Sequence, residues 1–152
     1  MSSSPVTRRI NASPASVYRA LIDARAVEKW RVPDGMSSNV HTFDAREGGG
    51  FRISLTYEDP SRAGKTAGHT DTYHGYFQRL VPNRQVVEVV EFETTDFEML
   101  GEMTITTTLE DIEGCTEVSV VYGGLPEGVS EADNEAGTAM ALSKLAALVE
   151  AD

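Results

Sequence analysis

Two acidic residues stand in a segment that is otherwise rich in valine. Glu88 and Glu91 lie within residues 86–93, and in a strand their side chains would point to opposite faces. Whichever faces the interior would be a carboxylate in apolar surroundings, where desolvation favours the protonated form and suits the group to acid or base catalysis. The alternative is a glutamate at an edge or on the outer face of a sheet.

Two histidines and an aspartate are close enough in sequence to suggest a metal site. His69 and Asp71 would share one face of a strand, whereas His74 would point to the other, so the three cannot converge without a bulge. No further histidine or cysteine completes the set, and His41 is isolated. We therefore expect no metal, and we interpret His41 as a surface or half-buried polar residue.

Three other features could in principle take part in catalysis or binding, but their sequence context does not support such a role. Cys115 follows the turn Glu113-Gly114 without a nearby histidine to generate a thiolate. The glycines at 48–50 lack the lysine and Ser/Thr of a phosphate loop, so they indicate a turn. Arg52 could bind an acidic group, but strand alternation places it opposite Phe51. We expect no cofactor.

Length and charge narrow the class of protein. The 152 residues suit one domain, which we place at 1–152. The net charge of −11 repels a phosphate backbone, so nucleic acid is not an expected partner. The N-terminus lacks the apolar stretch of a secretory signal, and no run is long enough to insert in a membrane. A single cysteine fits a reducing compartment, so we expect the protein in the cytoplasm.

The order of predicted elements is one strand, two short helices, about six strands and a long helix. Ser13-Pro14 predicts the start of the first helix, and Asp23 can cap a second that ends near Trp30. Short turns make the sheet antiparallel, and only one long helix is available to cover it. The sheet should therefore curl around that helix. Strands are predicted at 6–10, 40–43, 51–57, 70–81, 86–93, 99–109 and 116–122.

The last helix, from the cap Ser130 to about Glu150, carries many small side chains. Small residues facing a curved sheet mean either close helix–sheet packing or a cavity. Leu142, Leu145 and Val149 form an edge beside the predicted inner stripe. That stripe comprises Ala136, Ala139, Met140, Ser143, Ala146 and Ala147.

Several short segments form a recognisable series along the chain: Ile10-Asn11-Ala12-Ser13-Pro14 with Val17 and Tyr18, Trp30, Gly48-Gly49-Gly50-Phe51, His74-Gly75-Tyr76-Phe77 through Val81-Pro82, and Gly137 with Leu142, Leu145 and Ala146. In this order they resemble the START-like (SRPBCC) superfamily, which has the helix-grip fold also seen in birch-pollen-allergen-like and polyketide-cyclase-like proteins. Within it the chain is most similar to domains related to the C-terminal domain of the activator of the 90-kDa heat-shock-protein ATPase. Thr138 stands where the family usually has tryptophan after the helix glycine.

The resemblance implies an α+β helix-grip fold, with a curved antiparallel sheet of six or seven strands around the C-terminal helix. It also implies a ligand cavity between them, although the same side chains could form a filled core. The residues that we expect to face this cavity are Trp30, Phe43, Phe51, Ile53, Leu55, Tyr57, Phe92, Met103, Tyr122 and Met140.

Three functions are compatible with this reading. The first is binding of a small hydrophobic or amphipathic ligand. The second is a cyclase, hydrolase or isomerase that uses one inward acid, with the hydroxyls of Tyr57, Tyr73 and Tyr122 orienting the substrate. The third is interaction with a chaperone, although the activator also needs a second domain for which this chain has no room. Tyr76 on an outer sheet face would suit a symmetric homodimer.

Overall fold

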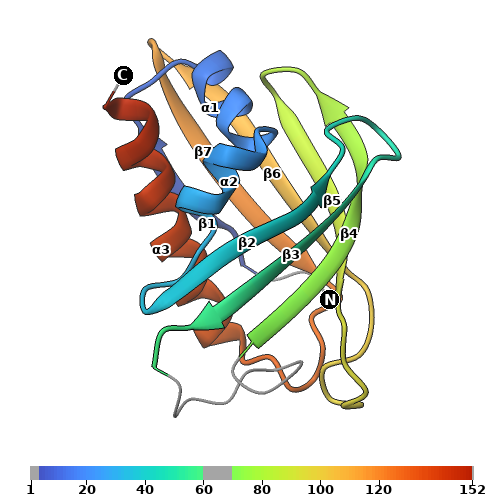
Figure 1. Cartoon of the computed structure of the whole chain (residues 1–152). Coiled ribbons are helices and arrows are strands. Elements are labelled where there is room, and N and C mark those ends of the chain that lie inside the picture. Colours follow the sequence, from blue (N-terminus) through green and yellow to red (C-terminus); the bar gives the residue numbers. More distant parts are fainter. Residues whose placement is uncertain (1–3, 60–69, 152) are drawn as a thin grey trace.

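The computed structural model describes residues 4–59 and 70–151. A strongly bent sheet curls around one long helix (Figure 1). The predicted α+β helix-grip fold is confirmed, with seven strands. None of the described helices is long and apolar enough to cross a bilayer. The elements in chain order are β1 (Val6–Ile10), α1 (Pro14–Leu21), α2 (Ala24–Trp30), β2 (Met36–Phe43), β3 (Gly50–Tyr57), β4 (Thr70–Val81), β5 (Gln85–Phe92), β6 (Met103–Ile112), β7 (Cys115–Gly123) and α3 (Glu131–Glu150).

All seven strands form one antiparallel sheet in the order β1-β7-β6-β5-β4-β3-β2. The pairing shifts register within β2 at Val40/Thr42 and within β4 at Phe77/Arg79, and such bulges bend a sheet. Gly75 in β4 allows the backbone of β5 to approach closely, because a Cβ atom at position 75 would lie 2.2 Å from the Val89 carbonyl oxygen. These features let the sheet curl around α3, as Figure 1 shows.

Local capping sets where the helices begin. The Ser13 hydroxyl accepts a hydrogen bond from the Ser16 N–H, and the Asp23 carboxylate accepts one from the Arg25 N–H. Ser130 caps α3 in the same way through the Asp133 N–H. The three caps predicted from the sequence are thus confirmed.

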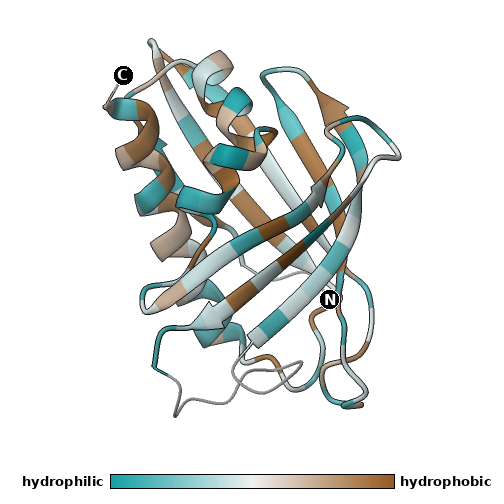
Figure 2. Ribbon diagram, in the orientation of Figure 1, coloured by the Kyte–Doolittle hydropathy of each residue, from teal (hydrophilic) through white to brown (hydrophobic). Residues whose placement is uncertain are grey.

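The buried face of α3 differs from the predicted stripe. Ala136, Ala139, Ser143 and Ala147 are exposed, whereas Thr138, Leu142, Leu145, Ala146 and Val149 are buried. Of the predicted stripe only Ala146 is buried. Because α3 carries alanine around much of its circumference, alanine alone does not mark its buried face. Figure 2 shows apolar residues along the helix and on the strands it faces.

The sixth strand begins later than the sequence suggests. The alternation predicts a strand from residue 99, but residues 97–99 form a turn and β6 starts at Met103. Gly101 has a φ of +116°, which extended strands do not adopt. The inner face of β6 nevertheless carries Met103, Ile105 and Leu109, as predicted.

Candidate functional site

A cavity of about 450 Å³ lies between the concave face of the sheet and the N-terminal half of α3. Its helix wall includes the small side chains of Ala136, Thr138 and Ala141, the glycine Gly137 and the larger side chain of Met140. A Cβ at Gly137 would meet no atom within 4 Å, so the helix does not press on the sheet there. The sheet contributes residues from β3 to β7, and the segment from α2 to β2 closes one side.

The structure brings seven of the ten predicted pocket residues to this cavity. Those that line it are Trp30, Leu55, Tyr57, Phe92, Met103, Tyr122 and Met140. Phe43, Phe51 and Ile53 do not line it. Phe43 and Phe51 pack instead against Phe77, with ring centroids 5.5 and 5.1 Å from that ring, and Ile53 is fully buried in the core. Aromatic packing therefore fills one part of the interior and leaves the other part hollow.

An ion pair lies in the cavity wall. Arg31, the residue after α2, donates a hydrogen bond from Nη1 to Oε1 of Glu88 on β5, at 2.6 Å. Side-chain exposure is 17% for Arg31 and 8% for Glu88, so both charges are largely removed from bulk water. Burial alone would lower the pKa of Arg31, but the Glu88 carboxylate, together with Tyr73 and Tyr122, raises it by more, so the pKa is raised. Arg31 therefore stays charged.

The guanidinium of Arg31 also contacts aromatic rings. Its central carbon lies 5.8 Å from the centroid of Phe51 and 5.5 Å from that of Tyr73, within cation–π range. Phe51 belongs to the filled aromatic cluster and Tyr73 to the cavity lining. Arg31 thus lies at the boundary between the packed and the hollow part of the interior.

Tyr73 carries a buried hydroxyl that has no hydrogen-bond partner in the described parts of the chain. Burial raises the pKa of this phenol to about 12, so it stays protonated and is a donor. Buried polar groups are nearly always paired, and leaving one unpaired costs about 1–3 kcal/mol. An unpaired donor in a cavity-lining residue suggests that an acceptor is supplied from elsewhere.

The loop between α2 and β2 is fastened to α3. Lys144 donates from Nζ to the Val32 carbonyl oxygen at 2.5 Å and lies 3.0 Å from an Asp34 carboxylate oxygen. The Asp34 N–H also donates to the sulfur of Met140, at 3.0 Å. Val32 and Asp34 line the cavity, so these contacts hold one of its sides in place.

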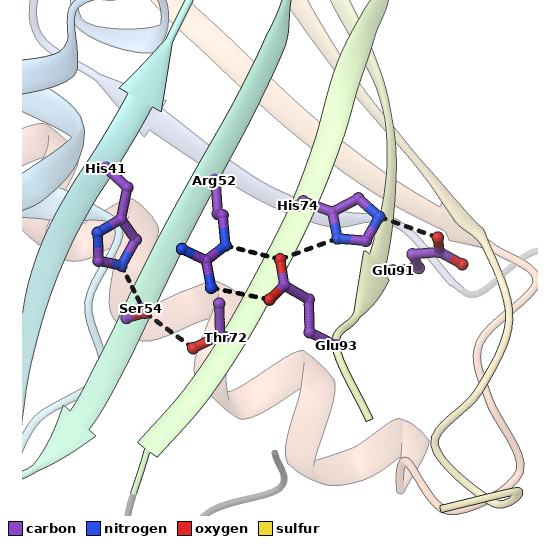
Figure 3. A network of polar contacts seen from close by, with 7 residues as sticks. All are labelled: His41, Arg52, Ser54, Thr72, His74, Glu91 and Glu93. Atoms are coloured by element: carbon purple, nitrogen blue, oxygen red, sulfur yellow. Dashed lines mark hydrogen bonds and ion pairs between the residues drawn. The ribbon is translucent and has the colours of Figure 1, made fainter. Parts of the chain in front are cut away.

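The outer face of the sheet carries a separate polar network (Figure 3). Arg52 donates two hydrogen bonds to Glu93, at 2.8 and 3.0 Å, and His74 lies between Glu93 and Glu91. Glu91 thus points away from the cavity, while Glu88 lines it, which resolves the ambiguity of the sequence. His41 is exposed and within hydrogen-bond distance of Ser54, as Figure 3 shows.

The residues considered for a metal separate in the structure. Asp71 is buried and lines the cavity, whereas His74 lies on the outer face. His69 lies outside the described residues. Among the residues that are described, no group of three His, Cys, Asp or Glu side chains is arranged to hold a metal ion.

Sequence reasoning overlooked Arg31, the residue that pairs with Glu88. The signal was indirect: a glutamate within a run of buried valines needs a cationic partner. Residues 31 and 88 are 57 positions apart, and only the fold shows that the end of α2 lies against β5.

Residues 11–150 match the family model described as Activator of Hsp90 ATPase homolog 1-like protein. A Chromobacterium violaceum protein of known crystal structure is similar, with 29% identity and a TM-score of 0.88 over 98% of this chain and 97% of that one. A solution structure from Arthrobacter aurescens has 18% identity and a TM-score of 0.81, covering 97% of this chain and 86% of that chain. An AHSA1-like protein from Aeromonas hydrophila has 16% identity and a TM-score of 0.71, with 97% and 93% covered. No curated protein is significantly similar.

Proposed function

The chain belongs to the Activator of Hsp90 ATPase homolog 1-like family, and from this membership and the cavity we propose that it binds a small hydrophobic or amphipathic molecule between the sheet and α3. The observation that carries the proposal is the cavity of about 450 Å³. Ligand pockets commonly measure roughly 300–1,000 Å³ and combine apolar walls with a few polar groups. An engineered apolar hole of roughly 150 Å³ already binds benzene, so a two-ring molecule fits here.

The wall has the chemistry of an amphipathic site. Most of its side chains are apolar, including Leu55 on β3, Val90 on β5 and Ile105 on β6. Its charged pair, Arg31 and Glu88, is fixed by a hydrogen bond and by ring contacts. A ligand would gain affinity from apolar burial and orientation from the polar groups.

A pair of tryptophan variants on α3 tests the proposal. Thr138 is buried and lines the cavity, so Thr138→Trp should fill the space, whereas the neighbouring Ala139 is exposed and Ala139→Trp should not. Native mass spectrometry, followed by extraction, would detect a retained molecule, and calorimetry with benzophenone would measure binding directly. We expect binding in the wild type and in Ala139→Trp only. Equal binding by Thr138→Trp, or no binding by any form, would contradict the proposal.

A second candidate is catalysis on the bound molecule, which the inward position of Glu88 favours. Its carboxylate lines the cavity together with Tyr57, Tyr73 and Tyr122, the hydroxyls predicted to orient a substrate. The hydrogen bond from Arg31 is what distinguishes this carboxylate from the lone acid that the sequence suggested. If the retained molecule is converted, Glu88→Gln should bind it without turnover, and unchanged turnover would exclude Glu88 as the acid or base. The chaperone-interaction alternative has no comparable observation in its favour.

A further inference from the structure

We infer that the cavity selects a neutral molecule bearing a hydrogen-bond acceptor, such as a ketone, ester or amide carbonyl, which accepts from Arg31. This inference rests on the proposed function and specifies the class of ligand. It derives from three features of the wall: a cation with donors to spare, a carboxylate that cancels its charge, and the buried hydroxyl of Tyr73.

Arg31 has donors that Glu88 does not use. A guanidinium has five N–H groups, and within the described chain Nη1 is the only guanidinium nitrogen of Arg31 that is hydrogen-bonded, to a single oxygen of Glu88. The side chain lines the cavity and keeps 17% of its surface exposed. A carbonyl oxygen of a ligand is therefore a suitable partner for the remaining N–H groups.

The charge balance of the wall disfavours an anionic ligand. Glu88 already neutralises Arg31 at 2.6 Å, so a second carboxylate would approach a pair with no net charge. Within residues 4–59 and 70–151, the other charged residues of the lining are acidic: Asp34, Asp71 and Asp133. An anion would lose hydration and gain no uncompensated cation, whereas a neutral acceptor loses far less on transfer.

Tyr73 supplies a second donor in the same wall. Its ring lies 5.5 Å from the Arg31 guanidinium carbon, and its hydroxyl has no partner among residues 4–59 and 70–151. The hydroxyl is covered by neighbouring side chains. Those side chains must shift before a ligand oxygen can accept a hydrogen bond from it. Tyr73 is thus the second donor that we assign to the oxygen of the ligand.

Three probes of similar shape test the inference by calorimetry: benzophenone, which has a carbonyl, diphenylmethane, which lacks it, and diphenylacetate, which is anionic. We expect wild type to bind benzophenone about three- to tenfold more tightly than diphenylmethane, the range for one neutral hydrogen bond, and to bind diphenylacetate most weakly. Equal affinities for benzophenone and diphenylmethane would overturn the inference while leaving the ligand-binding role intact. Failure to bind any of the three would overturn both.

Removing the neutralising charge should reverse the preference. In Glu88→Gln the Arg31 cation is uncompensated, so affinity for diphenylacetate should rise about ten- to a hundredfold, the range for a hydrogen bond between charged groups. Glu91→Gln is the matched control, because Glu91 lies on the same strand but on the outer face. An unchanged preference in Glu88→Gln that is folded by circular dichroism would overturn the inference. The wild-type probe ratios decide it if that variant does not fold.

Discussion

The ion pair between Arg31 and Glu88 allows a quantitative test by a double-mutant cycle. Removing one partner of a buried pair leaves an uncompensated charge and costs about 3–5 kcal/mol, whereas replacing both with apolar residues is often neutral. Glu88 is the more buried partner, with 8% of its side chain exposed against 17% for Arg31. Arg31→Leu, which strands the carboxylate, should therefore be more destabilising than Glu88→Leu, which strands a guanidinium that still reaches the cavity.

Urea unfolding of the two single variants and the double variant measures these free energies. For a chain of this size, a loss of 3–5 kcal/mol corresponds to a fall in Tm of about 6–20 °C. We expect the double variant to lie within about 1.5 kcal/mol of wild type. Losses of the two single variants that simply add in the double variant would refute this reasoning. Single losses below about 1 kcal/mol, which are typical of exposed pairs, would refute it as well.

Three further predictions concern Tyr73, Glu93 and Lys144. Burial raises the pKa of Tyr73 from its ordinary value of 10 to about 12, so the stability that this group contributes is complete below pH 10 and is lost as pH rises through about 12. The free energy of unfolding of Tyr73→Phe, measured as a function of pH, should not show this loss at alkaline pH. Hydrogen bonds from Arg52, and then from His74, lower the pKa of Glu93, so its contribution is present above pH 4.5 and is lost at lower pH. Glu93→Gln should cost less than about 1 kcal/mol at pH 7, and a difference from wild type that persists in acid would contradict this. Lys144→Met should speed hydrogen exchange at the Asp34 amide, because the α2–β2 loop loses the two contacts that Lys144 makes and keeps only the weak bond to the Met140 sulfur. Unchanged exchange would show that Lys144 does not hold the loop.

The sequence predicts the elements well because their signals are local. Alternation along residues 51–57 places Phe51 and Arg52 on opposite faces, and the structure confirms this. The caps at Ser13, Asp23 and Ser130 depend on hydrogen bonds within three residues, so short-range reasoning suffices. The family resemblance is also confirmed, over residues 11–150.

The site is less predictable because it depends on contacts between distant residues. Alternation separates Glu88 from Glu91 but cannot tell which face is concave. The partner of Glu88 comes from the end of a helix 57 positions away. Phe43 and Phe51 are as apolar as the true lining residues, and only their packing against Phe77 removes them from the cavity. A ligand-contacting role for the seven lining residues stays a prediction, as does a homodimer through Tyr76, which is 40% exposed.

Methionine methyl groups offer the most direct measurement of whether the interior accepts a guest. Met36, Met103 and Met140 line the cavity from β2, β6 and α3, whereas Met99 lies in the loop before β6 and does not. Labelling the methionine methyl carbons with ¹³C and titrating benzophenone would report on all of them in one spectrum. We predict saturable shifts for the three cavity methyl groups and none for Met99. Unmoved cavity methyl signals at saturating probe would contradict the claim that the space between the curved sheet and α3 is a binding site.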